Sequence, residues 1–396
     1  MKLSKNVKKQ ILNIAFVVVL VAITFVALFA ANDELSWTDI KNYFKKCNFW
    51  MFGCGVLCMF GFIFFEGLSL YVICRRLGYK PKMRSSLAYS TSDVYYSAIT
   101  PSATGGQPAS AFYMVRDGID GGTSGFALMF NLLAYTGAIL VIGLLAFALG
   151  WGTFWQLGTV VKIVVLLGFG AQIVLFGFFF LCMKYDKIVL KLGRGGIAFL
   201  RKIRLMKNPE KWLKKWDGVV EKYHKGFEKV RHHKGIFWLA LLLNVLQRVS
   251  QVMITYFVIA AVRSNVNVIE VFAAQAFVTL GYNSIPLPGG VGAFELLYLN
   301  TYRAMGFENH FVLVAVMITR LISYYACMLL SGGYTLTYHL LGGKKKKAAQ
   351  PAIVEGEIAS TLASETPEQR TNEEETETTP QQEKQNLEEE NNESDQ

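Results

Sequence analysis

The sequence is short of charged residues and of the motifs that mark soluble enzymes. Charged side chains make up 17% of its 396 residues, and it holds five histidines. A zinc-binding H-E-x-x-H pair, a phosphate-binding P-loop and a G-x-S-x-G nucleophile turn are all missing from it. We therefore expect no catalytic residues, no metal site and no cofactor, and the missing P-loop disfavours an ATP-driven pump.

Cysteine is also scarce, and its surroundings are mostly apolar. Cys54 and Cys58 share a helix face, but no neighbouring side chain completes a set of metal ligands. We interpret all the cysteines as small hydrophobic residues. There are six: Cys47, Cys54, Cys58, Cys74, Cys182 and Cys327.

Long apolar runs are abundant, and hydrophobic residues make up 53% of the sequence. Runs of more than about 18 apolar residues are long enough to cross a bilayer. The run at 11–31 has no small-residue cleavage site, so we expect a retained helix and not a signal peptide. The sequence predicts an all-α integral membrane protein, with about six spanning helices and two re-entrant helical hairpins in an inverted repeat. The expected spans are 11–31, 49–74, 123–150, 159–183, 235–262 and 311–341, and the hairpins are 87–115 and 268–303.

Positive charge gathers in a few loops, and its distribution predicts the orientation. Short Lys/Arg-rich loops lie on the cytoplasmic side of a membrane, and such loops occur at 75–84, 184–234 and 344–347. We therefore expect a multi-pass protein of the cell membrane with both termini in the cytoplasm. The membrane domain, 1–348, divides into a first half (1–183), a cytoplasmic basic segment (184–234) and a second half (235–348). The acidic tail, 349–396, has the composition of a disordered segment.

The basic segment contains an amphipathic helix at 208–230. Asn208 can cap its N-terminus and Pro209 can occupy its first position. The apolar residues share one face with lysines beside them, which is typical of a helix on an anionic membrane surface. Packing on a partner or on the protein's own loops is an alternative, and nucleic-acid binding is not favoured. The apolar face comprises Trp212, Leu213, Trp216, Val220, Tyr223, Phe227 and Val230.

Two Gly-rich turns interrupt apolar stretches that are too short to cross a bilayer twice. They read TPSATGGQPA at 100–109 and PLPGGVGA at 286–293, and share a Pro, a Gly-Gly pair and an Ala. Broken backbone at membrane depth is tolerated only where protein buries it or where it lines a wet cavity. We therefore predict that the two turns build one substrate site near the membrane midplane. Their candidate residues are Gly105, Gly106, Gly289 and Gly290.

Arg248 is the strongest candidate for a ligand-binding residue. It lies in the middle of the predicted span 235–262, where a charge costs about 2.5–3.5 kcal/mol unless a partner, a cavity or a ligand compensates it. Because a guanidinium can bind phosphate through two hydrogen bonds, we expect Arg248 to bind a phosphate group. For the amides on the same face, hydrogen bonding between helices is an alternative role. The residues on this face are Asn244, Gln247, Gln251 and Thr255.

Polar residues also recur at related places in the two halves. Arg320 precedes a tyrosine by one helical turn, and Asn131 does the same in the corresponding span. Glu66 lies in the span that the repeat relates to the one carrying Arg248. From topology alone we expect Glu66 to pair with Arg248 or with Arg320 and so to shape the cavity.

The hairpins carry the polar residues Asp93, Gln107 and Glu295. Helix N-termini that follow Gly-rich breaks can present backbone N–H groups to an anion, and we expect the hairpins to do so. Alternatively, the glycines only permit tight helix packing. Asp93 and Glu295 are also candidate proton or cation sites in coupled transport, and the sequence does not decide between these roles.

Together, the TPSATGGQP and PLPGGVGAFE stretches resemble the flippase-like membrane family typified by the N-terminal half of lysylphosphatidylglycerol synthase/flippase proteins. The resemblance covers about residues 5–345. It implies a translocase that moves aminoacylated phosphatidylglycerol, or a related anionic lipid, to the outer leaflet and protects bacteria against cationic antimicrobial peptides. In that family a soluble C-terminal domain transfers lysine from lysyl-tRNA, and residues 349–396 do not resemble it.

Two alternatives to translocation stay open at this point. By family name the protein would be a phosphatidylglycerol lysyltransferase, but its residues offer no basis for aminoacyl transfer, so a separate synthase would have to act in trans. A lipid-binding membrane scaffold is the second alternative. The expected partners are a phospholipid substrate, the anionic membrane surface through 208–230, a separate synthase and a second copy of the chain, with no nucleic acid.

Overall fold

A computed structural model describes most of the membrane domain. The predicted first span at 11–31, the tail at 349–396 and Gly289 lie outside the described residues. The residues described are 36–100, 103–202, 209–231, 235–285, 287 and 290–341.

Five helical stretches in this part of the chain are long and apolar enough to span a membrane, and they confirm five of the predicted spans. Every regular element of the described residues is helical, as the apolar runs require, because a lone helix satisfies its own backbone hydrogen bonds in lipid. The stretches are α3 (Phe49–Arg76), α6 (Gly121–Leu149), α8 (Thr159–Lys184), α11 (Gly235–Ala260) and the last stretch, Asn309–Leu341.

The two interrupted stretches each form a pair of shorter helices, as predicted. The first pair is α4 (Met83–Ile99) and α5 (Gly106–Arg116), and the second is α12 (Val268–Asn283) and α13 (Ala293–Ala304). The longest, α4, has 17 residues, or about 26 Å at 1.5 Å per residue, which is shorter than the roughly 30 Å hydrocarbon core. None of the four can therefore cross the core alone.

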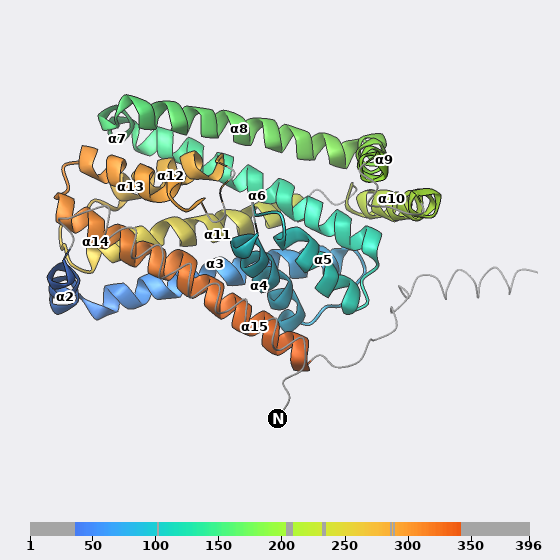
Figure 1. Cartoon of the computed structure of the whole chain (residues 1–396), viewed down its shortest axis with the longest axis horizontal. Helices are drawn as coiled ribbons and strands as arrows, with labels where there is room; N and C mark the ends of the chain where they lie inside the picture. The colour runs from blue at the N-terminus through green and yellow to red at the C-terminus, as the bar shows by residue number, and fades with distance from the viewer. Residues whose placement is uncertain are drawn as a thin grey trace, which may run out of the picture. The chain divides into compact units, whose positions relative to one another are not determined.

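Four further helices connect the spans at their ends. The loop expected at 32–48 contains a helix, because Ser36 and Asp39 form a reciprocal capping box at its start. The two hairpins lie at opposite ends of the bundle, α12 and α13 near α2 and α7, and α4 and α5 toward α9 and α10 (Figure 1). The connecting helices are α2 (Trp37–Lys46), α7 (Trp151–Gln156), α9 (Asp186–Lys202) and α10 (Pro209–Arg231).

The last span is not one regular α-helix, although the sequence predicts a continuous helix at 311–341. It consists of α14 (Asn309–Arg320), a π-helical segment η3 (Leu321–Ala326) and α15 (Cys327–Leu341). A π-helical turn takes in more residues than an α-helical turn, and such segments are frequent at functional sites. Arg320, the last residue of α14, lies directly before this change of pitch.

Helix α8 forms an outer edge of the bundle (Figure 1). Only 17% of its most apolar window is buried, against 72% for the last span, so most of its apolar surface faces lipid. Lys162 near its start lies 5.0 Å from the ring of Trp155, and Lys184 at its end lies 5.3 Å from the ring of Tyr185. Aromatic and basic side chains of this kind mark the two interfaces of a membrane.

The apolar face of α10 packs on the protein itself. Val220, Tyr223 and Val230 are buried, and the Tyr223 ring meets the Phe126 ring edge-on, with 5.3 Å between centroids. A Cβ at Gly122 would collide with the backbone of α10, so the absence of a side chain lets α6 and α10 approach. In the part of this face that the structure describes, the helix therefore packs on its own protein, as in the alternative to membrane-surface binding.

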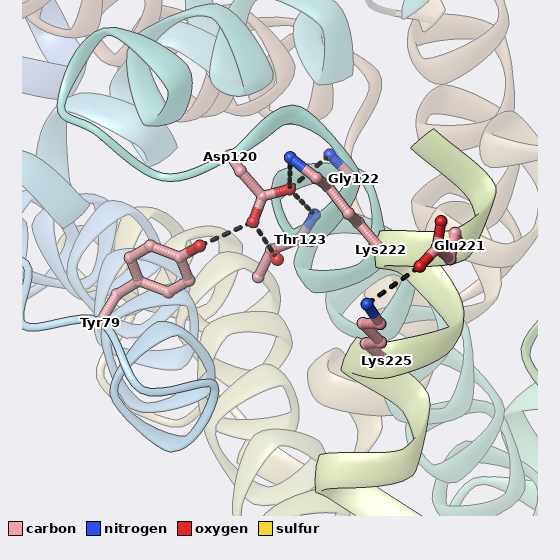
Figure 2. Close-up of polar contacts among 7 residues, drawn as sticks. All are labelled: Tyr79, Asp120, Gly122, Thr123, Glu221, Lys222 and Lys225. Carbon is pink, nitrogen blue, oxygen red and sulfur yellow. Dashed lines mark hydrogen bonds and ion pairs between the residues drawn. The ribbon is translucent and has the colours of Figure 1, made fainter. Parts of the chain in front are cut away.

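Asp120 ties α10 to the start of α6 (Figure 2). Its carboxylate caps α6 by accepting from the N–H groups of Gly122 and Thr123, and it accepts from the Tyr79 hydroxyl at 2.6 Å. The Lys222 ammonium of α10 lies 4.0 Å away. Burial alone would raise the pKa of Asp120, but the hydrogen bonds from Thr123 and Tyr79 and the charge of Lys222 outweigh it and lower this pKa.

We expect Asp120→Asn to lower the stability of the protein at pH 7 by about 1 kcal/mol, because asparagine keeps the cap but loses the charge. Because the pKa of Asp120 is lower in the folded protein than in the unfolded chain, its carboxylate stabilises the fold fully at pH values above the unfolded pKa of about 3.9. This contribution is lost as the pH falls through the lower pKa of the folded state. Melting temperatures of wild type and variant in detergent should therefore differ at pH 7 and converge in acid.

Glu221→Gln is the matched control, because Glu221 lies on α10 with an exposed partner, Lys225, at 2.9 Å. Exposed pairs of this kind contribute little to stability, so its melting temperature should follow wild type at both pH values. A loss for Asp120→Asn that is the same at pH 7 and in acid would contradict the charge-based account.

Candidate functional site

A cavity of about 500 Å³ lies among the two hairpins, α3, α6, α11 and the last span. The first hairpin contributes residues on both sides of its turn, including Ser97 and Ala103, and the second contributes Ser284 and Gly290. The two Gly-rich turns, which lie about 180 positions apart in the sequence, therefore border one space. Most of the predicted site residues line it: Glu66, Asp93, Gln107, Gln247, Arg248, Gln251, Gly290 and Arg320.

Three of the predicted residues, Gly105, Gly106 and Glu295, do not line the cavity. Gly105 and Gly106 stand at the start of α5, and Gly106 packs so closely on α4 that a Cβ would overlap the Asp93 carboxylate and the Ser97 hydroxyl. Glu295 is buried in the first turn of α13. The two glycines therefore permit tight packing between the limbs of the hairpin, which is the alternative role given for them above.

Arg248 lies in the cavity wall as a buried cation. Its side chain belongs to a residue that is only 4% exposed, and its guanidinium donates to Gln251 and stacks 4.1 Å from the Tyr135 ring centroid. Among the described residues no carboxylate lies within 4.0 Å of it, and its Nε has no hydrogen-bond partner. A buried charge needs compensation, so this guanidinium is suited to an anion in the cavity.

Arg320 differs from Arg248 because its charge is neutralised within the protein. Its Nε lies 2.7 Å from Glu295 Oε1, both side chains are buried, and its Nη2 donates to the Gly290 carbonyl at 3.0 Å. The predicted Glu66–Arg320 pair is therefore wrong. Topology could not reveal Glu295 as the partner, because Glu295 lies in a hairpin limb and not in a span. Arg320 thus fastens the second turn to the last span.

Backbone N–H groups at both turns are used inside the hairpins. The Gly105 N–H donates to the Thr100 hydroxyl at 2.8 Å. At the second turn the Gly292 N–H donates to Glu295 Oε2 at 2.7 Å, and the Gly290 N–H donates to the Leu287 carbonyl. These three donors are therefore engaged within the hairpins, and anion binding through the other N–H groups at the starts of α5 and α13 stays a prediction.

Glu66 belongs to a polar cluster that joins four helices. Its Oε2 accepts from Ser90 Oγ and from Gln247 Nε2, each at 3.1 Å. Asp93 lies one helical turn after Ser90 on α4, and Gln107 Nε2 donates to its carboxylate at 3.3 Å. The described residues show no ion pair within 4.0 Å between Glu66 and Arg248, although the guanidinium acts electrostatically on both carboxyl groups.

The amides on the face of Arg248 divide between the two predicted roles. Asn244 is fully buried and donates to Asn131 Oδ1 at 3.1 Å, which also accepts from Ser69 at 2.6 Å. This network joins α11, α6 and α3, so Asn244 connects helices. Gln247 and Gln251 line the cavity instead.

The sequence analysis missed several cavity residues from α12. Gln275, Thr279 and Tyr282 line the cavity, and the Tyr282 hydroxyl lies 3.5 Å from Gln251 Nε2. A side chain at Gly290 would collide with the Tyr282 ring, so Tyr282 packs under the second turn. The signal in the sequence was Gln275, an amide in the middle of a largely apolar hairpin limb.

Comparison with known proteins gives one long match and one short one. Residues 11–331 match the family described as lysylphosphatidylglycerol synthase TM region. A UPF0104 membrane protein of Archaeoglobus fulgidus is 26% identical over 113 residues, which is 28% of this chain and 33% of that relative. The match thus spans about a third of the length of that relative. No solved structure matches the chain.

Proposed function

Because the chain belongs to the lysylphosphatidylglycerol synthase TM region family, we propose that it moves a phospholipid between the leaflets of the bacterial cell membrane. The substrate is lysyl-phosphatidylglycerol or a related lipid with a phosphate headgroup. Transfer of the lysyl ester, whose amino groups outweigh its phosphate charge, to the outer leaflet lowers the negative surface charge and so contributes to resistance against cationic antimicrobial peptides. Both termini lie in the cytoplasm in this proposal.

The observation that supports this proposal is the buried position of Arg248 in the cavity wall, with no carboxylate partner in the described part of the chain. Arg248 is a buried residue that lines the cavity, and no carboxylate lies within 4.0 Å of its guanidinium among the described residues. A lipid phosphate that enters the cavity would compensate this charge. The volume of about 500 Å³ falls within the roughly 300–1,000 Å³ of small-ligand sites. It is suited to a headgroup whose acyl chains stay in the surrounding lipid.

The two hairpins provide a basis for access from both leaflets. They lie at opposite ends of the bundle (Figure 1), and residues near both turns line the same cavity. In transporters with inverted repeats, interrupted helices meet at a central site, and one repeat moves against the other around it. Movement of one hairpin would open the cavity toward one leaflet, and movement of the other would open it toward the second leaflet.

The proposal is tested by leaflet redistribution in proteoliposomes that contain labelled phosphatidylglycerol, its lysyl ester or a polyprenyl phosphate. We expect selective movement of one lipid, slowed at least about tenfold by Arg248→Ala, because hydrogen bonds to charged groups contribute about 1.5–3 kcal/mol and 1.4 kcal/mol corresponds to a factor of ten. Arg248→Lys keeps the charge but loses the planar fork, and should transport at an intermediate rate.

Arg303→Ala is the matched control, because Arg303 is exposed at the end of α13 and does not line the cavity. It should move lipid at the wild-type rate. Folded wild-type protein that moves none of the three lipids under any imposed ion or voltage gradient would overturn translocation.

A lipid-binding scaffold is the second candidate, and α10 is the observation that favours it. Lys222 and Lys225 remain exposed on this helix, whereas Val220, Tyr223 and Val230 are buried. Each basic residue near an anionic leaflet contributes about 1 kcal/mol of attraction. A scaffold would bind anionic vesicles through these lysines without moving lipid, whereas the translocase moves lipid even when both lysines are replaced by glutamine.

A further inference from the structure

The carboxyl groups of Glu66 and Asp93 form a pair in the cavity wall. Glu66 comes from α3 and Asp93 from α4, and both line the cavity. Ser90, which donates to Glu66 at 3.1 Å, lies one helical turn before Asp93 on α4, so the two carboxyl groups share one part of the wall. Two carboxylates in one poorly solvated site repel each other when both are ionised, so the pair favours holding one proton.

The surroundings of the pair are polar and largely neutral. Ser90 and Gln247 donate to Glu66, and Gln107 donates to Asp93. Gln247 is 1% exposed, and its Oε1 has no partner among the described residues.

The titratable and charged groups that face the pair come from three further helices. Arg248 of α11 acts electrostatically on both carboxyl groups. Tyr135 of α6 lies close enough to interact electrostatically with both carboxyl groups, and Cys327 of α15 interacts in the same way with Glu66. Tyrosine and cysteine stay neutral at physiological pH unless strongly perturbed. Arg248 is therefore the one permanent charge facing the pair within the described residues.

We propose that Glu66 and Asp93 form a proton-binding site whose occupancy is linked to the binding of an anionic headgroup at Arg248. This inference rests on the proposed function, because the headgroup is the ligand that changes the charge of the cavity. With one proton on the pair, the pair carries −1 and Arg248 carries +1. An entering phosphodiester adds a charge of −1, and a second proton from cavity water restores neutrality.

The linkage is reciprocal, because each ligand changes the affinity of the other by the same factor. An anionic lipid binds more tightly when the second proton is present, by up to about tenfold per pH unit for one linked proton. Release of the headgroup favours release of that proton. A proton gradient can therefore drive the direction of lipid movement without an ATP-binding site.

The test follows the infrared carbonyl band of protonated carboxylic acids in full-length protein, in vesicles of phosphatidylcholine alone or with phosphatidylglycerol. We expect wild type to show a band that titrates with pH and that Glu66→Gln and Asp93→Asn each diminish. Phosphatidylglycerol should shift its titration to higher pH, and Arg248→Ala should abolish that shift. Glu308→Gln, an exposed carboxylate paired with Arg263 outside the cavity, should leave the band unchanged.

The outcomes separate this inference from the proposed function. A band that neither Glu66→Gln nor Asp93→Asn changes would overturn the proton site, whatever the lipid does. A band that titrates identically with and without phosphatidylglycerol, in protein whose transport of that lipid depends on Arg248, would overturn the linkage and leave translocation standing. Absence of lipid movement together with a lipid-sensitive band would overturn translocation and leave the linked proton site standing.

Discussion

Arg320→Met is expected to destabilise the protein by about 3–5 kcal/mol, the cost of leaving one partner of a buried ion pair alone. The Arg320 and Glu295 side chains are 4% and 8% exposed, so water cannot solvate the carboxylate that remains. The variant also loses the hydrogen bond to the Gly290 carbonyl, and with it one tie to the second turn. Unfolding of purified protein in detergent, followed by circular dichroism, measures the loss.

The double variant Arg320→Met with Glu295→Gln is the control for this account. Glutamine keeps an acceptor for the Gly292 N–H but leaves no unpaired charge, so the double variant should recover much of the stability. A double variant as unstable as the sum of the two single losses would show no coupling between the residues. Arg303→Met, an exposed arginine, should change stability by less than about 0.5 kcal/mol.

Gly106→Ala is expected to lower stability by about 1–3 kcal/mol or more, although alanine is the better helix former. The added methyl group would overlap Asp93 Oδ1 and Ser97 Oγ, and would lie 2.7 Å from the Asp93 backbone oxygen. The carboxylate can move, but the backbone of α4 cannot move without separating the two limbs. The separation would also displace Asp93 from Glu66, so the lipid-sensitive proton band should weaken together with stability.

Gly125→Ala is the matched control, because Gly125 is an exposed glycine within α6 with no atom within 4 Å of the added methyl group. It should be neutral or stabilising by up to about 1 kcal/mol, as for alanine in place of glycine within a helix. The two substitutions thus have opposite expected signs. A Gly106→Ala variant as stable as wild type would show that the limbs are not in close contact.

The fold could be predicted from the sequence to a large extent, because a membrane permits few solutions. The apolar run of α8, followed by the basic segment at 184–234, is long enough that a spanning helix is its expected form. The turns at 100–109 and 286–293 identified two hairpins, since their limbs are too short to span. Lipid allows only helices and closed barrels, so run length and charge carry most of the information.

The pairing of polar side chains could not be predicted in the same way. Helical periodicity shows which residues share a face, but it does not give the depth and rotation of one helix against another. Glu66 therefore meets Gln247, 181 positions away, while Arg320 meets Glu295 from a hairpin limb. The π-helical segment after Arg320 adds a change of rotation that no composition signal indicated.

Helix α8 also makes the protein sensitive to the thickness of its bilayer. Its 26 residues extend about 39 Å, whereas a typical hydrocarbon core measures roughly 30 Å. With a basic–aromatic pair near each end, the helix fits such a core when it tilts, and a thicker membrane lets it stand closer to the normal. Because α8 packs against α6 and α12, we infer that acyl-chain length changes the packing of the second hairpin.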